Sequence, residues 1–244
     1  MEIGLNSAES WNAEWEKWFA RYSRGTPRLG MWLAWSQKVD GRDTLELGAG
    51  SGRESRFLAA RARSVTCVDF SSGAMDALRE SRPPLNLRAC TMDARNLDFP
   101  DGAFDLSFHK GFWSCFGDDD DVALLFAEQL RVTRGTLLAL VHNAANSKMH
   151  EMFRRKAGTD KLYQVRFYQP EELMTIARSG LADAGIDAAV RIRGFGGPDW
   201  MHRGLLARSN PSVQGCLAAL AYRCRPLAQA ESLVLEVRIT NRHP

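Results

Sequence analysis

The sequence predicts an α/β fold with a parallel sheet, and two neighbouring stretches carry this prediction. In the first, residues 44–47 form a short apolar run, residues 53–63 carry apolar side chains at helical spacing, and three glycines lie between them. The second stretch, residues 64–69, is another short apolar run and ends in an acid. Strand, glycine turn, helix and second strand together form the opening of a nucleotide-binding βαβ unit.

The glycine turn consists of Gly48, Gly50 and Gly52. Glycines lack side chains, so a ligand can approach the backbone closely. The dinucleotide fingerprint G-x-G-x-x-G needs its third glycine at position 53, which is Arg53 here. Asp69 lies about 20 residues beyond Gly48, where an α/β nucleotide site places the carboxylate that binds the ribose hydroxyls. The spacing indicates a nucleotide-like ligand, although the dinucleotide pattern is incomplete.

Further strands and helices alternate along the rest of the chain. The remaining strands are expected at residues 85–90, 104–108, 136–141, 186–195 and 232–240. A helix is expected from Ser71 or Ser72 to about Glu80, because a serine can cap its first turn. The four acids at residues 118–121 complement the dipole of another helix, and a third runs from about residue 170 to Gly185.

Four short motifs occur in a fixed order between residues 39 and 141. They are E-x-G-x-G-x-G from Glu46, Asp69-Phe70-Ser71-Ser72-Gly73-Ala74-Met75, Met92-Asp93-Ala94, and Phe99-Pro100-Asp101-Gly102-Ala103-Phe104-Asp105. The set resembles the class I S-adenosylmethionine-dependent methyltransferases, especially their small-molecule type 11 group. This resemblance implies a Rossmann-like, seven-stranded sheet between helices, with strand order 3-2-1-4-5-7-6 and an antiparallel strand seven.

The resemblance also implies S-adenosylmethionine as cofactor and S-adenosylhomocysteine as product. Most of the implied cofactor contacts lie in the four motifs: Glu46, Gly48, Ala49, Gly50, Asp69, Phe70, Met75, Asp93 and Ala94. Asp69 would hold the ribose, while Asp93 and Ala94 would bind the adenine. Met75 would lie against the adenine, or else simply pack in the core. Arg28 could pair with the methionine carboxylate, although an arginine is more commonly solvated.

Two histidines are the candidate catalytic residues. His109 and His142 end the predicted fourth and fifth strands, and ligands of open α/β sheets lie beyond such strand ends. His109 is also a candidate cofactor contact. If the acceptor is a hydroxyl, either histidine could serve as the base, since imidazole titrates near neutral pH. Alternatively, each is a structural histidine bonded to the backbone.

The first 38 residues are rich in aromatic side chains, which recur at helical spacing at Trp11, Trp15, Trp18, Phe19 and Tyr22. They predict an amphipathic helix that packs on the domain or forms a lid over the cofactor. The whole chain is expected to form one methyltransferase domain. Its expected parts are a helical cap (residues 1–38), the core (39–198 and 232–240) and a helical insert (199–231).

Composition limits the possible partners. The net charge of +3, with 32 basic and 29 acidic residues in no clustered stripe, does not favour nucleic acid. Neither the five cysteines nor the acidic run has metal-ligand spacing, so no metal is expected. Without a membrane span or leader, we expect a cytoplasmic monomer or homodimer.

Three functions remain open. The first is methyl transfer to an oxygen or nitrogen of a small molecule, such as a natural-product intermediate or a sugar. The second is methylation of RNA or protein, which a basic face would support; its arginines would be Arg191, Arg193, Arg203, Arg208, Arg223 and Arg225. The third is a non-catalytic binding module, against which the intact glycines and Asp69 argue.

Overall fold

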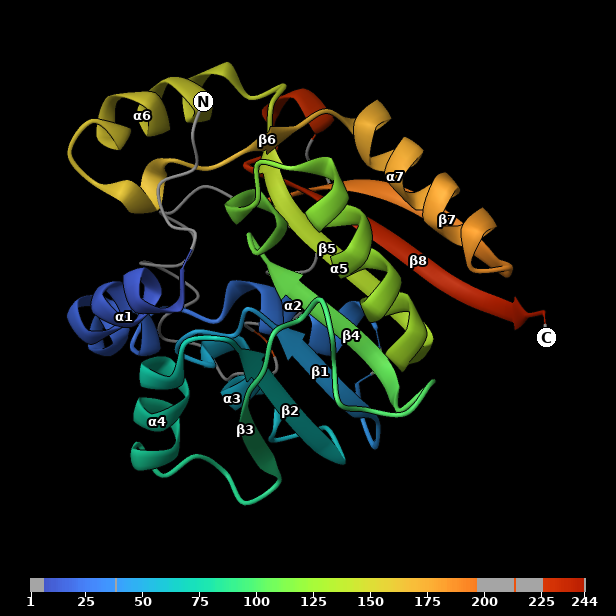
Figure 1. The fold of residues 1–244 in the computed structure, drawn as a ribbon, viewed down its shortest axis with the longest axis horizontal. Coiled ribbons are helices and arrows are strands. Elements are labelled where there is room, and N and C mark those ends of the chain that lie inside the picture. The colour runs from blue at the N-terminus through green and yellow to red at the C-terminus, as the bar shows by residue number, and fades with distance from the viewer. Residues whose placement is uncertain (1–6, 38, 197–212, 214–225, 244) are drawn as a thin grey trace.

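The computed structural model describes residues 7–37, 39–196, 213 and 226–243. These residues form a sheet with strand order β3-β2-β1-β4-β5-β8-β7, and β6 pairs with β5 off this path (Figure 1). Every pairing is parallel except those of β8, which runs antiparallel to both β5 and β7. The strands are β1 (Asp43–Leu47), β2 (Ser64–Asp69), β3 (Leu87–Thr91), β4 (Phe104–Lys110), β5 (Thr133–Asn143), β6 (Phe167–Tyr168), β7 (Ile186–Phe195) and β8 (Ser232–Arg242).

The predicted sheet order is confirmed, because β7 and β8 are the sixth and seventh predicted strands. Only β6 is additional, and it consists of two residues. The insert predicted at residues 199–231 lies almost wholly outside the described residues, as do Arg203, Arg208, Arg223 and Arg225.

Helices cover both faces of the sheet. They are α1 (Ala8–Ser23), α2 (Arg28–Ser36), α3 (Arg53–Leu58), α4 (Ser72–Glu80), α5 (Asp119–Val132), α6 (Ser147–Ala157) and α7 (Pro170–Asp183), with the short helices η1 (Trp113–Cys115), η2 (Lys161–Tyr163) and η4 (Leu227–Gln229). One hydrophobic core includes Leu33, Leu58 and Leu78 from α2, α3 and α4. A second core includes Phe126 from α5 and Leu173 from α7. Figure 1 shows α1 and α6 beyond the edge where the parallel strands end.

Polar side chains fix the ends of several helices. Ser71 caps α4 by accepting a hydrogen bond from the Ala74 amide at 3.1 Å. Asp118 caps α5 through the Asp120 amide at 3.0 Å, which confirms the capping interpretation of the acidic run. The predicted helix at residues 53–63 is too long, since α3 ends at Leu58. There the Asn86 side-chain amide binds two carbonyls of the following turn, which leads the chain back into β2.

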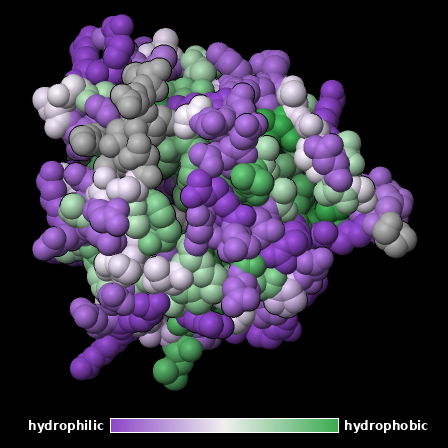
Figure 2. Space-filling model, in the orientation of Figure 1, coloured by the Kyte–Doolittle hydropathy of each residue, from purple (hydrophilic) through white to green (hydrophobic). Residues whose placement is uncertain are grey.

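The outer surface is mixed in character. Figure 2 shows hydrophobic residues scattered over a largely hydrophilic face. Within the described residues, no helix combines the length and the apolar character needed to cross a membrane.

Candidate active site

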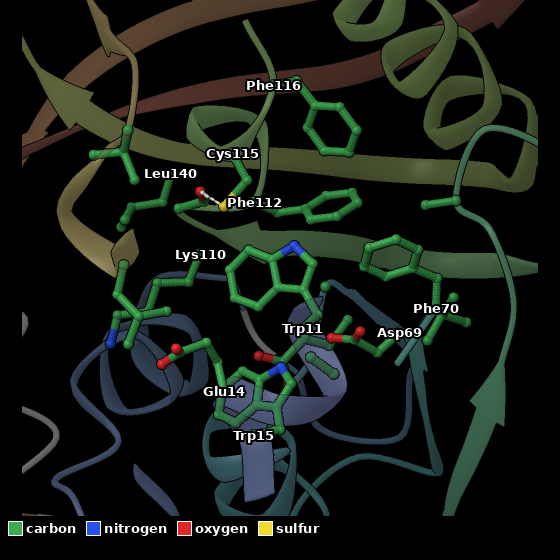
Figure 3. Close-up of a pocket in the computed structure, with 18 of the residues that line it drawn as sticks. Trp11, Glu14, Trp15, Asp69, Phe70, Lys110, Phe112, Cys115, Phe116 and Leu140 are labelled. Atoms are coloured by element: carbon green, nitrogen blue, oxygen red, sulfur yellow. Dashed lines mark hydrogen bonds between the residues drawn. The ribbon is translucent and has the colours of Figure 1, made fainter. Parts of the chain in front are cut away.

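A pocket of about 740 Å³ opens beyond the carboxyl ends of β1, β2, β4 and β5. This is where an open α/β sheet binds its ligand, and the volume is in the range of small-molecule and cofactor sites. Four groups of residues contribute to its wall: the glycine turn, the ends of β2 and β4, the loop after β3, and α1. Figure 3 shows Trp11 near the centre, with Asp69 and Phe70 to one side and Lys110 to the other.

The glycine turn is possible only with glycine at these positions. Gly48 and Gly50 have φ angles of +57° and +50°, in the left-handed region. A Cβ atom at Gly48 would lie 2.4 Å from the Phe112 ring, and one at Gly50 would lie 2.0 Å from the Trp15 ring. Gly48 and Ala49 line the pocket, whereas the Trp15 ring covers Gly50.

Asp69 connects the end of β2 to the glycine turn. Its Oδ2 accepts a hydrogen bond from the Gly50 amide at 2.9 Å, and its Oδ1 accepts one from the Ser71 amide at 2.9 Å. Burial raises the pKa of this carboxyl, while the backbone donors act in the opposite direction. Each oxygen keeps a second lone pair, so the carboxylate can also accept from ligand hydroxyls. Phe70 follows it in the pocket wall.

Asp93 and Ala94 lie in the same wall, after β3. Arg95 binds the Asp93 carboxylate at 2.7 Å and also reaches Asp121 at 2.8 Å. The guanidinium lowers the pKa of Asp93 and keeps its carboxylate ionised. Ala94 is buried and contributes to the pocket wall.

Three titratable groups, Glu46, Glu54 and Lys110, line the pocket together; both glutamates are buried, and Lys110 is partly exposed. Glu46 accepts hydrogen bonds from the Ser55 amide at 3.2 Å and the Ser55 hydroxyl at 2.5 Å, and burial raises its pKa to about 8. Burial acts to raise the pKa of Glu54 too, but the charges of Lys110 and Arg53 outweigh it and the pKa falls. The Lys110 ammonium lies 2.7 Å from Glu54.

His142 stands at the end of β5 and faces the pocket. Its ring contacts Phe153 and Phe167, with centroid distances of 4.8 and 5.4 Å. Burial lowers its pKa to about 4, so the ring is neutral at pH 7. A neutral imidazole can accept a hydrogen bond from a ligand N–H or O–H group.

Helix α1 covers the pocket with one aromatic face, to which Trp11, Trp15, Trp18 and Tyr22 contribute. Trp11 and Trp15 stack with their centroids 6.4 Å apart. On the neighbouring side of α1, Asn12 accepts hydrogen bonds from the Ser71 hydroxyl at 2.7 Å and the Gly73 amide at 3.1 Å. These bonds fasten α1 to the start of α4.

Comparison with known proteins supports the fold and links part of the chain to a family. Residues 44–135 match a family described as "Methyltransferase domain". The chain is 36% identical over 104 residues to the cypemycin N-terminal methyltransferase of a Streptomyces species; the match covers 41% of this chain and 42% of that relative. The matched segment is thus similar to a methyltransferase domain, and it contains the glycine turn and Asp69.

Solved methyltransferase structures share the fold over most of the chain. A possible histamine N-methyltransferase from Thermotoga maritima has a TM-score of 0.59 at 17% identity, covering 93% of this chain and 96% of its own. The magnesium protoporphyrin IX methyltransferase from Synechocystis, crystallised with S-adenosylmethionine, has a TM-score of 0.53 at 13% identity, covering 87% and 76%. The methyltransferase match and this cofactor-bound neighbour support S-adenosylmethionine as the cofactor.

The residues of this methyltransferase fit that cofactor. Gly48 offers bare backbone at the pocket floor, and Asp69 offers carboxylate lone pairs to the ribose. Asp93 and Ala94 offer an acceptor and a buried backbone beside the position for the adenine. Their convergence in one cavity follows from the parallel strands, whose carboxyl ends meet at one edge.

Four predicted site residues lie outside the pocket wall, and one of them, Gly50, is covered by the Trp15 ring. His109 pairs with Leu47 and Ala139 in the sheet and points into the second core, because side chains alternate along β4. It is fully buried, and burial lowers its pKa to about 3, so the expectation that it faces the crevice was wrong. Met75 is fully buried in the first core, consistent with the alternative of core packing. Arg28 is outside the pocket wall and forms an ion pair with Glu231 at 3.0 Å.

Sequence reasoning missed the pair of Lys110 and Glu54. Lys110 follows His109 directly, so strand alternation could have indicated that one of the two faces the pocket. Glu54 lies in the first turn of α3, where an acid is commonly explained by its favourable interaction with the helix dipole. Within the described residues, no group of three or more His, Cys, Asp or Glu side chains is arranged to hold a metal ion.

Proposed function

We propose that this protein transfers the methyl group of S-adenosylmethionine to an oxygen or nitrogen atom of a small molecule, such as a natural-product intermediate or a sugar. The observation that supports it is the pocket in which the predicted cofactor residues and an aromatic compartment lie together beneath α1. A concave compartment of this kind suits a small acceptor better than a nucleic-acid strand. Among the described residues, Cys67, Cys90 and Cys115 are free thiols, in keeping with a cytoplasmic location, and we propose a monomer or homodimer.

The bound cofactor supplies a methyl group on a positively charged sulfur, so the protein chiefly has to orient the acceptor and exclude water. The Trp11 and Trp15 rings shield the pocket and present π faces that attract a cation. His142 accepts a hydrogen bond from the acceptor and thereby directs its lone pair. The pKa of His142 is about 4, so the ring is a weak base and does not hold a proton at neutral pH. Its role in this proposal is to orient the acceptor.

A nitrogen acceptor is the better supported choice within this proposal. The curated relative is named for methylation of an N-terminus, and a structural neighbour is named as a possible histamine N-methyltransferase. A peptide N-terminus is therefore a second candidate acceptor. A neutral amine can attack the methyl group through its lone pair without a strong base to remove a proton first. This agrees with His142, which is neutral and weakly basic.

Calorimetric titration with S-adenosylmethionine and S-adenosylhomocysteine, with NAD as control, tests the cofactor assignment. Binding of the first two and not of NAD is the expected result. A panel of amines and matched alcohols then tests the acceptor, with release of S-adenosylhomocysteine as readout. Turnover of alcohols alone would contradict the nitrogen preference, and absence of cofactor binding would contradict the function.

A further inference from the structure

A second cavity of about 300 Å³ adjoins the main pocket, between α1 and η2. Five residues line both cavities: Trp18, Tyr22, Arg53, Leu162 and Tyr163. The second cavity is therefore a continuation of the first. It adds Arg21 and Asp160 to the wall and contains none of the cofactor residues.

Aromatic rings lead from the reaction centre to this second cavity. The ring of His142 lies 4.8 Å from that of Phe153, which in turn lies 5.0 Å from that of Tyr163. Trp18 and Tyr22 of α1 complete the shared wall. A molecule that extends from His142 to the second cavity would thus contact aromatic side chains along its length, which favours a flat apolar body.

Three cations lie over the rings at the far end of this path, and one of them, Arg21, lines the second cavity. Lys17 and Arg21 lie over the Trp18 ring at 4.9 and 5.2 Å, and Lys156 lies over the Tyr163 ring at 4.7 Å. Among the described residues, none of the three forms an ion pair with a carboxylate.

The acids beside these cations are already engaged. Glu14 accepts a hydrogen bond from the Trp18 indole at 3.0 Å, and Asp160 accepts one from the Leu162 amide at 3.0 Å. Arg53 is bound to Glu54 at 3.0 Å. Two arginines, Arg21 and Arg53, line the second cavity, and Arg53 is already paired with Glu54. The guanidinium of Arg21 can therefore bind an anion there.

We infer that the methyl acceptor is an elongated aromatic molecule with an anionic group, such as a carboxylate or sulfonate, at the end remote from the methylated atom. Its body lies along Phe153 and Tyr163, and Arg21 binds its anionic end in the second cavity. This inference rests on the proposed function, because it identifies the chemical class of that acceptor.

Two fluorescent probes of similar shape test the site directly. The probe 8-anilinonaphthalene-1-sulfonate carries a sulfonate, whereas N-phenyl-1-naphthylamine has the same rings without it. Both are titrated into the protein in the presence of S-adenosylhomocysteine. The substitution Arg21→Met should weaken the sulfonate probe about tenfold, as expected for a lost charge-assisted hydrogen bond, and leave the neutral probe unchanged. Tyr163→Ala should weaken both probes, because both contain the aromatic body.

The substitution Lys148→Met is the matched control, since Lys148 is exposed on α6 and lies outside both cavity walls. Arg21→Lys should restore part of the sulfonate affinity. Failure of the wild-type protein to bind the sulfonate probe would overturn the inference, as would an equal effect of Arg21→Met and Lys148→Met. Calorimetry of S-adenosylhomocysteine on each variant keeps this failure distinct from a failure of the cofactor assignment.

Discussion

The two sides of the pocket that we propose for the cofactor and for the acceptor are built in different ways, and we call them the cofactor side and the acceptor side. On the cofactor side, short turns after β1, β2 and β3 contribute backbone amides and carboxylates, as in the bonds from Asp69 to Gly50 and Ser71. On the acceptor side, α1, the end of β5, α6 and η2 contribute aromatic side chains that touch one another, such as His142, Phe153 and Tyr163. The first side depends on backbone geometry, and the second on side-chain packing.

This difference corresponds to what each side must recognise. A cofactor shared by a whole family needs the same polar contacts in every member, and those contacts come from a few turns of a fixed fold. An acceptor differs from enzyme to enzyme, so its compartment is formed by side chains on segments that can vary around a rigid scaffold. Substitutions on the cofactor side should therefore abolish ligand binding, whereas those on the acceptor side should tune it.

The largest effect is expected at Gly50. Gly50→Leu forces a side chain into a left-handed backbone and into the Trp15 ring, where a Cβ would lie 2.0 Å away. It should also disturb the bond from the Gly50 amide to Asp69. We expect affinity for S-adenosylhomocysteine to fall by about 100-fold or more by calorimetry, since both backbone strain and a lost bond contribute.

The matched control is Gly158→Ala, because a Cβ at Gly158 meets no atom within 4 Å and its φ is −70°. This variant should bind the cofactor as the wild type does. Circular dichroism on both variants separates loss of the site from loss of the fold. Retained affinity in a folded Gly50→Leu protein would mean that the glycine turn does not hold the cofactor.

A somewhat smaller effect is expected for Asp69→Asn. The amide that replaces one oxygen is a donor, so it can no longer accept from a backbone amide or from a ribose hydroxyl. We expect about a 30-fold loss of S-adenosylhomocysteine affinity from the charged hydrogen bonds. Asp76→Asn, at an exposed position on α4, should bind normally. Equal affinities of the two variants would rule out Asp69 as the ribose ligand.

The same contrast explains which features could be predicted from the sequence. Motifs on consecutive turns indicated Gly48, Asp69, Asp93 and Ala94, because their function depends on local spacing and on the sheet that the strands form. The contact between α1 and the pocket brings together residues such as Asn12 and Ser71, which lie far apart in the chain. The direction of the His109 side chain depends on which face of β4 this residue occupies. The periodicity of the sequence did not determine that face.

A moderate effect on the acceptor side is expected for Asn12→Ala. It removes the side chain that binds Ser71 and Gly73 and holds α1 over the pocket. Dissociation of S-adenosylhomocysteine in stopped-flow measurements should become about fivefold faster, since three partly exposed hydrogen bonds, one of them long at 3.5 Å, are lost and each contributes roughly 1 kcal/mol or less. Asn241→Ala, at an exposed position near the end of β8, should leave the rate unchanged. An unchanged rate in Asn12→Ala would show that α1 does not limit release of the product.

The smallest effect, and the most discriminating, concerns His109 in β4 and His142 in β5. Burial lowers the pKa of His142 to about 4 and that of His109 to about 3, below the ordinary value of 6.5. The unfolded chain therefore binds more protons as pH falls below 6.5, and the folded state loses stability progressively down to these values. His142→Asn and His109→Leu should each reduce this acid destabilisation, measured as the melting temperature at pH 7 and pH 5.

Only His142 faces the pocket, so only His142→Asn should also change acceptor turnover. Wild-type turnover should be insensitive to protonation of His142 between pH 8 and pH 6, because the neutral ring persists until the pH approaches about 4. An NMR titration midpoint for His142 near the ordinary value would contradict this. If His109→Leu alters turnover as strongly as His142→Asn, then β4 as well as β5 contributes to the acceptor side, and the two sides of the pocket are less separate than their construction indicates.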